Sequence, residues 1–296
     1  MIANIPGANI SARACRLIMT ALTPLLVWGT PPAAAQDCGA TIGPGEPGVE
    51  VFLDGDIGPC NTDPALTIEG PVTVNLNGFT ISCVVPDADE GFMGIEIVGV
   101  NAWVLNGVVE DCEDGVVVDG GPGGGRHIVT KLTVKSTQHQ VGNRGFRVRS
   151  DGNHLIDNRA NRFSGIGFRV DSSDNRLVNN LAVRNEDEGF RIEPEAQNNT
   201  LIGNQARNNG ATDNEAGVRI RGDGNLLLSN TSRRNLGDGI LLEVDQEESE
   251  AAENNSIIRN ISRGNVGVNL VDQNPECDAN RWLKNRARTT SQDCID

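Results

Sequence analysis

A short motif recurs along most of this chain, and its spacing limits the folds that the chain can adopt. The motif consists of an Asn, two apolar residues at the third and fourth places, and a second Asn at the sixth. Clear copies begin at Asn153, Asn175, Asn199, Asn225, Asn255 and Asn280, and looser copies begin at Val72, Asn101 and Arg126. Successive copies are 22 to 30 residues apart. A period in this range is typical of a repeat architecture.

A second landmark follows in each repeat, where a Gly opens a short alternating segment of the form Gly-apolar-x-apolar. These segments begin at Gly94, Gly115, Gly145, Gly167, Gly189, Gly217, Gly239 and Gly267. Because successive side chains of a strand point to opposite faces, the apolar residues are predicted to face the core. The residues between them are predicted to face outward.

Strands this short are not stable alone, so each repeat must stack on its neighbours. The repeats are too short for crossover helices, and no helical period separates them. One repeat therefore predicts one turn of a coil whose strands pair in parallel. The predicted fold is all-β, a single-stranded right-handed parallel β-helix, or solenoid, of about nine coils.

The second Asn of the motif is predicted to be structural. Asn tolerates the left-handed backbone of a tight turn, and its amide can bond to the equivalent Asn in the next coil. The predicted ladder consists of Asn77, Asn106, Asn158, Asn180, Asn204, Asn230, Asn260 and Asn285.

The N-terminal segment has the pattern of a secretory signal. Arg13 and Arg16 precede the apolar run Leu17–Trp28, and Ala33–Ala35 follows it. This order predicts a signal peptide over residues 1–35; a buried N-terminal helix is the alternative. A cap segment is expected over residues 36–71 and the coil over residues 72–296, closed by a C-terminal disulfide. The protein is then exported, to the periplasm or beyond, without a membrane span.

The charge balance bears on possible partners. The chain has 25 basic and 40 acidic residues, and the predicted signal removes two of the basic ones, which leaves a mature net charge of −17. Such a charge argues against nucleic acid or an anionic membrane as a partner. The three histidines are not clustered, and no metal site is predicted.

The cysteines of the mature chain are even in number, as expected of an exported protein with disulfides. Cys83 and Cys112 occupy equivalent places in adjacent repeats, and one rung is a suitable distance for a disulfide. The other two pairs flank the N-terminal segment and the last coil, where a cross-link would close an open end. The predicted bonds are Cys38–Cys60, Cys83–Cys112 and Cys277–Cys294; six buried thiols are the alternative.

The outward positions of the Gly-led strands carry a row of like charges. Arg147, Arg169, Arg191 and Arg219 follow one another in four consecutive repeats, with Asp171 and Glu193 beside them. Stacked like charges are unfavourable. Either the carboxylates neutralise a structural ladder, or the row binds an anionic chain, because Arg suits bidentate contact with carboxylates. In the second case, replacing Arg169 and Arg191 should abolish binding.

The Asn and Gly-[Phe/Ile/Val]-x-[Val/Ile/Leu] rows resemble the repeat of pectate-lyase-like and NosD-like proteins, from about Asp37 to the C-terminus. The resemblance implies the fold strongly and the activity weakly. The leading hypothesis is non-catalytic binding of an anionic polysaccharide, or a structural surface role. The alternatives are a lyase or epimerase of a uronate polymer, which implies calcium, and a periplasmic accessory protein of NosD type. No catalytic residue is assigned, and no cofactor is expected outside the lyase hypothesis.

Overall fold

The fold was obtained as a computed structural model. It describes residues 37–45, 48–84, 91–121, 123–137, 142–244, 251–277 and 279–295. These residues belong to one compact unit, Pro31–Asp296. The predicted signal segment and residues 85–90, 138–141 and 245–250 lie outside the described residues.

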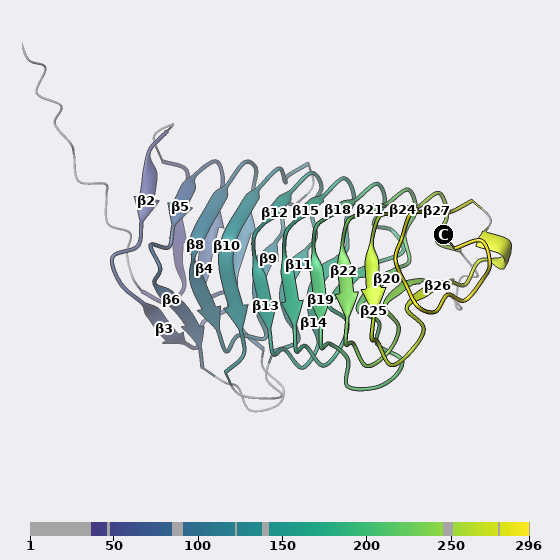
Figure 1. The fold of residues 1–296 in the computed structure, drawn as a ribbon. Coiled ribbons are helices and arrows are strands. Elements are labelled where there is room, and N and C mark those ends of the chain that lie inside the picture. The colour runs from purple at the N-terminus through teal and green to yellow at the C-terminus, as the bar shows by residue number, and fades with distance from the viewer. Residues whose placement is uncertain are drawn as a thin grey trace, which may run out of the picture. The chain divides into compact units, whose positions relative to one another are not determined.

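The described residues form a parallel β-solenoid, drawn in Figure 1 as a series of stacked coils. The predictions of an all-β fold and of about nine coils are confirmed. One wall, which we call sheet 1, contains ten parallel strands in the described part of the chain. They are β1 (Ala40–Ile42), β4 (Leu66–Glu69), β7 (Met93–Val98), β9 (Asp114–Val118), β11 (Arg144–Val148), β14 (Ile166–Val170), β17 (Phe190–Ile192), β20 (Val218–Ile220), β23 (Ile240–Leu242) and β26 (Leu270–Asp272).

Two further walls complete each coil, and the eight-residue strands β8 and β10 run through both of them. Sheet 2 consists of β2 (Glu50–Phe52), β5 (Thr73–Asn75), β8 (Trp103–Glu110), β10 (Ile128–Lys135), β12 (His154–Ile156), β15 (Arg176–Val178), β18 (Thr200–Ile202), β21 (Leu226–Leu228), β24 (Ser256–Ile258) and β27 (Arg281–Leu283). Sheet 3 consists of β3 (Ile57–Cys60), β6 (Thr80–Cys83), the second halves of β8 and β10, β13 (Arg159–Asn161), β16 (Leu181–Val183), β19 (Gln205–Arg207), β22 (Thr231–Arg233) and β25 (Ile261–Arg263).

Parallel pairing already begins in the segment expected to be a cap, because β1 pairs with β4 and β2 pairs with β5. Residue 71 therefore marks no change in pairing. The other regular element is a short 3₁₀ helix, η1 (Pro275–Cys277). No helix among the described residues is long and apolar enough to cross a membrane.

The core is a thin apolar column, as the alternation in the Gly-led strands predicts. Phe146, Phe168 and Phe190 are fully buried at equivalent places of sheet 1. Their rings stack with centroids 4.6 and 4.9 Å apart. The last Gly-led segment is shifted from its expected register: Leu270 pairs with Ile240, so Asn269, and not Gly267, occupies the place of the strand-opening glycine.

Six of the eight predicted ladder residues stack as expected, and two do not. Each side-chain oxygen of Asn158, Asn180, Asn204, Asn230, Asn260 and Asn285 accepts the backbone N–H one coil earlier, at 2.7 to 3.0 Å. Asn77 and Asn106 lie outside this ladder. In the pairing of β8 with β10, the residue opposite Leu132, which donates to Asn158, is Gly107. Asn106 therefore lies one residue before the ladder position. Both Asn77 and Asn106 are exposed, and they have left-handed φ values of 55° and 61°.

The expected reason for the Asn ladder also needs correction. In the later coils the left-handed residue is the one before the ladder, for example Asp157 and Asn179, both with φ of 56°. The ladder Asn residues are selected for hydrogen bonding inside a buried corner, where an unpaired backbone N–H would be costly.

Two more Asn ladders occupy the other corners of the coil. The first motif Asn forms one, in Asn153, Asn175, Asn199, Asn225, Asn255 and Asn280. The other was not predicted, and it consists of Asn185, Asn209, Asn235 and Asn265. His127 stands at the start of the first ladder, where its backbone N–H donates to the Asn153 side chain at 2.8 Å. Burial lowers the pKa of His127 to about 4, so it is a neutral, structural residue.

All three predicted disulfides are present. Cys38–Cys60, Cys83–Cys112 and Cys277–Cys294 have Cα–Cα distances of 5.4, 4.9 and 6.1 Å. The second bond joins neighbouring coils, and the third closes the C-terminal coil. Trp282 of that coil is buried, and its indole N–H donates to Asp272 at 2.8 Å. Three disulfides are consistent with an oxidising compartment.

Candidate functional site

The predicted arginine row lies on the outer face of sheet 1, with its four members in register. Arg147 is paired with Arg169, Arg169 with Arg191, and Arg191 with Arg219. Each guanidinium also contacts a carboxylate. Asp171 accepts from Arg147 at 2.7 Å and from Arg169 at 2.6 Å. The two carboxylates predicted to lie beside the row are therefore part of it.

Arg169 also reaches Glu193, the second predicted carboxylate, at 3.0 Å. The other half of the row uses carboxylates that were not predicted to take part. Arg219 contacts Glu188 at 2.7 Å and Glu243 at 3.1 Å, and Arg191 contacts Glu188 as well as Asp187. The row is thus a ladder of side-chain contacts along four coils, in which Asp171 joins Arg147 to Arg169 and Glu188 joins Arg191 to Arg219.

The pKa values of the carboxylates follow from these contacts. Burial opposes ionisation of Asp171, but the hydrogen bonds from Arg147 and Arg169 outweigh it and lower its pKa. Glu188 has no solvent exposure; burial, together with a hydrogen bond to Asp187, raises its pKa to about 8. The geometry favours the structural alternative for the sheet 1 row, because its guanidiniums are already engaged.

No group of three or more His, Cys, Asp or Glu side chains among the described residues has an arrangement suited to a metal ion. The sheet 1 row therefore supplies charge pairing, and the described residues show no metal centre beside it.

A second arginine column, which was not predicted from the sequence, lies at the ends of the sheet 3 strands. Arg207 of β19 is in register with Arg233 of β22, and Arg233 with Arg263 of β25. A bridge between Ile261 and Arg286 places Arg288 in the following coil. We call Arg207, Arg233, Arg234, Arg263 and Arg288 the basic face.

The basic face differs from the sheet 1 row in having no counter-charge. Within the described residues, no carboxylate lies within 4.0 Å of these five guanidiniums, although eight other basic side chains are ion-paired. The Nε of Arg207 is buried and has no hydrogen-bond partner. Burial, with the charges of Arg233 and Arg159, lowers the pKa of Arg207. This surface is electrostatically unsatisfied.

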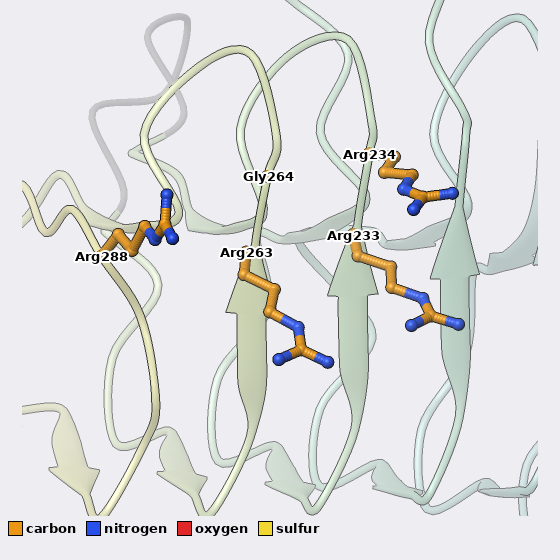
Figure 2. A pocket seen from close by; sticks show the side chains of 5 residues that line it. All are labelled: Arg233, Arg234, Arg263, Gly264 and Arg288. Atoms are coloured by element: carbon orange, nitrogen blue, oxygen red, sulfur yellow. The ribbon is translucent and has the colours of Figure 1, made fainter.

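A cavity of about 330 Å³ lies at the C-terminal end of the basic face. Arg233, Arg234, Arg263, Gly264 and Arg288 line it. Figure 2 shows Arg233 and Arg263 extending in the same direction from the ends of neighbouring strands, with Arg234 and Arg288 above them. The arrangement suits an anion that several guanidiniums contact together.

The family is decided by a comparison with family models. The model described as "Right handed beta helix region" matches residues 74–212 and 144–285. This chain belongs to the right-handed β-helix family. The match fixes the handedness of the coil and supports the pectate-lyase-like superfamily that the repeat resembles. No curated protein matches the sequence.

Several solved structures share the right-handed β-helix. The Dettilon tailspike protein is 15% identical, with a TM-score of 0.52, and the match covers 82% of this chain and 54% of the tailspike. The pectate lyase Pel9A is 15% identical over 82% of this chain and 70% of its own, with a TM-score of 0.41. The A-module of the Azotobacter vinelandii mannuronan C-5 epimerase AlgE4 is 13% identical over 88% and 90%, with a TM-score of 0.43. At 15% identity and a TM-score above 0.5, the likeness to the tailspike protein shows the fold alone.

The sequence of this β-helix does contain a signal for the basic face. An Arg stands two residues before three members of the unpredicted Asn ladder, in Arg207-x-Asn209, Arg233-x-Asn235 and Arg263-x-Asn265. Anchoring the repeat on the third corner of the coil would have aligned these arginines in one column.

Proposed function

We propose that this protein binds an extended anionic polysaccharide along its basic face, without catalysing a reaction on it. One observation carries the proposal: a column of guanidiniums at one per coil has no carboxylate partner among the described residues. Since the mature chain is expected to be strongly acidic, unpaired arginines in register are unlike the rest of its charge pattern.

The spacing of the column suits a linear polymer. Coils repeat at about 4.7–4.9 Å, similar in length to one sugar of an extended chain. A polymer with an anionic group on each sugar, aligned with the solenoid axis, would meet one guanidinium per residue. Arg also offers a planar fork of donors that matches a carboxylate.

The electrostatics of the two arginine surfaces favour the basic face over sheet 1. A polysaccharide on sheet 1 would have to displace Asp171, Glu193 and Glu243 from guanidiniums that they contact at 2.6 to 3.1 Å. Binding at the basic face breaks no such pair and supplies a counter-charge to guanidiniums that have none among the described residues.

Retention on immobilised polygalacturonate or alginate tests the proposal. The mature protein should be retained at low salt and released as salt rises, because exposed charges are screened. The double variant Arg233→Ala, Arg263→Ala should bind roughly tenfold or more weakly, because each charge-assisted contact that it loses is worth about 1.5–3 kcal/mol.

Two controls locate the site. The exposed Arg176 and Arg281 lie on sheet 2, so the matched double variant Arg176→Ala, Arg281→Ala should retain binding. Arg169→Ala with Arg191→Ala tests the sheet 1 row. Loss of retention in that variant, with an unchanged fold by circular dichroism and with Arg233→Ala, Arg263→Ala still retained, would return the site to sheet 1.

The rival function, cleavage or epimerisation of a uronate polymer, needs a catalytic group that reaches its substrate. Glu188 has the raised pKa expected of a general acid, but its side chain is 0% exposed. Incubation with uronate polymers and calcium, followed by ultraviolet detection of unsaturated ends and by analysis of the uronate composition, tests for both reactions. Product formation would overturn the non-catalytic part of the proposal.

A further inference from the structure

The cavity at the end of the basic face differs from the rest of the column in the number of charges that meet there. Four of its five lining residues are arginines, and they come from three successive coils. Arg207, the remaining member of the basic face, lies one coil nearer the N-terminus. The cavity therefore concentrates four of the five guanidiniums of the basic face at one place.

The backbone explains how the cavity forms. Arg234 and Gly264 hold equivalent places after β22 and β25, and both are left-handed, with φ of 57° and 68°. Where one coil has a long side chain, the next has none. A Cβ added to Gly264 would meet nothing within 4 Å, so the space at this glycine is open to a ligand.

The chemistry of the lining selects the shape of the anion. A planar carboxylate has two oxygens and one charge, which one guanidinium fork can satisfy. A tetrahedral oxyanion offers three oxygens in different directions, and a phosphate monoester carries nearly two negative charges at neutral pH. Four arginines from three coils that line one cavity match the second kind of group.

We infer that this cavity binds a tetrahedral oxyanion, a phosphate or sulfate ester carried by the polysaccharide. The inference rests on the proposed function and narrows its ligand class: the bound chain carries ester phosphate or sulfate in addition to, or in place of, carboxylates. Arg207, the remaining arginine of the basic face, then contacts the chain on the N-terminal side of that group.

One polymer backbone carrying different anions tests the inference. Binding of the mature protein is measured to dextran, carboxymethyl dextran, dextran sulfate and phosphorylated dextran, at equal degrees of substitution and equal ionic strength. The tetrahedral esters should bind roughly tenfold more tightly than carboxymethyl dextran, because additional charge-assisted hydrogen bonds form. Plain dextran should not bind. Between pH 5 and pH 8 the affinity for phosphorylated dextran should rise, because its second ionisation falls near pH 6, whereas that for dextran sulfate should not.

Variants connect the preference to the cavity. Arg263→Ala and Arg288→Gln should each remove most of the preference for the tetrahedral esters while leaving some binding to carboxymethyl dextran, and Arg281→Ala should change neither. Arg263, Arg288 and Arg281 are all exposed, so the fold is expected to persist, and thermal unfolding checks it.

The possible failures are distinguishable. Equal affinity for all three charged dextrans would overturn the inference and leave the proposed function standing. A preference that survives in both Arg263→Ala and Arg288→Gln would also overturn it. Binding of inorganic phosphate without any binding of phosphorylated dextran or dextran sulfate would show that the cavity takes the free ion, and it would overturn the inference. No binding to any charged polymer would reject the proposed function itself.

Discussion

At the scale of single residues, Glu188 shows how strongly burial and neighbours compete in this protein. Its carboxyl group has no solvent contact and lies between Arg191 and Arg219, next to the carboxylate of Asp187. Burial opposes the ionisation of Asp187 too, but the hydrogen bond from Glu188 and the charge of Arg191 lower its pKa. The two adjacent carboxyls thus shift in opposite directions, as expected for a pair that shares one proton.

This pair predicts a dependence of stability on pH. Because the pKa of Glu188 is raised from 4.5 to about 8 in the folded state, the native protein holds a proton that the unfolded chain releases within that range. The contribution of Glu188 to the free energy of unfolding should therefore fall as pH rises from about 4.5 to 8. Glu188→Gln stays neutral, so its free energy of unfolding in urea should rise relative to that of wild type by on the order of 4 kcal/mol between pH 5 and pH 8.5.

Asp171→Asn is the matched control for Glu188→Gln. The lowered pKa of Asp171 means that its stabilisation is complete above the normal carboxyl range and is lost as pH falls through the folded pKa. Its variant should thus be destabilised by a constant amount from pH 5 to pH 8.5. A Glu188→Gln variant that loses stability relative to wild type as pH rises would show that Glu188 is ionised in its arginine pair.

At the scale of elements, the buried Asn ladders fix the corners of the coil. Asn204 shows the pattern: its oxygen accepts the Asn180 N–H at 2.8 Å, and its amide donates to the carbonyl of Leu177 at 2.8 Å and to the Asn230 side chain at 3.1 Å. One side chain thereby serves three coils.

Removing that side chain should be costly. Asn204→Ala leaves several buried polar groups without partners, each at a cost of about 1–3 kcal/mol, so we expect a loss of roughly 3 kcal/mol or more in the free energy of unfolding. The exposed, left-handed Asn106 is the contrast: Asn106→Gly should change stability by only about 0.5 kcal/mol. Equal losses from chemical unfolding of the two variants would contradict the placement of Asn204 in the ladder and of Asn106 outside it.

Three features show what the sequence could and could not predict at the scale of strands and turns. The alternation in the Gly-led strands predicts the buried phenylalanines, because one face of a strand is either in the core or out of it. It does not predict that Asn106 is one place from the ladder, since the early repeats match the motif only loosely. Nor does it predict that Arg191 and Arg219 share Glu188, because that carboxylate lies before its strand and outside the alternation.

At the scale of the whole molecule, the solenoid depends on nearest-neighbour contacts between coils, and its ends lack a neighbour on one side. The Cys277–Cys294 bond closes a loop with a sequence separation of 17 residues at the C-terminal end. A loop of this size corresponds to about 3 kcal/mol of stabilisation. Its effect should be local, because each coil contacts only adjacent coils.

Cys277→Ser with Cys294→Ser should therefore open the last coils first. In hydrogen exchange, the amides of β26 and β27 should lose protection while those of β14 keep theirs. Cys83→Ser with Cys112→Ser gives the comparison, because that bond joins coils nearer the N-terminus. Uniform loss of protection along the chain in the C-terminal variant would show that the coils unfold as one cooperative unit.

The fold was predictable at this scale because every coil repeats the same constraints, so errors in single rows did not change the architecture. The basic face was not predictable, because what distinguishes it is the absence of carboxylates beside its arginines among the described residues. Whether an arginine is paired depends on carboxylates of neighbouring coils, such as Glu188 beside Arg219, and one repeat alone does not encode these contacts.

The register of Arg207, Arg233 and Arg263 has a consequence for any polymer bound to it. A chain displaced by one coil loses its contact with one of these guanidiniums, which is worth about 0.2–1 kcal/mol for an exposed ion pair, so neighbouring alignments of the complex are close in energy. Such a complex gains entropy from its equivalent alignments and lets the polymer slide in steps of one coil without full release. The surface would then hold a polysaccharide firmly in total while fixing no single sugar in place, except where the chain reaches the cavity beside Arg288.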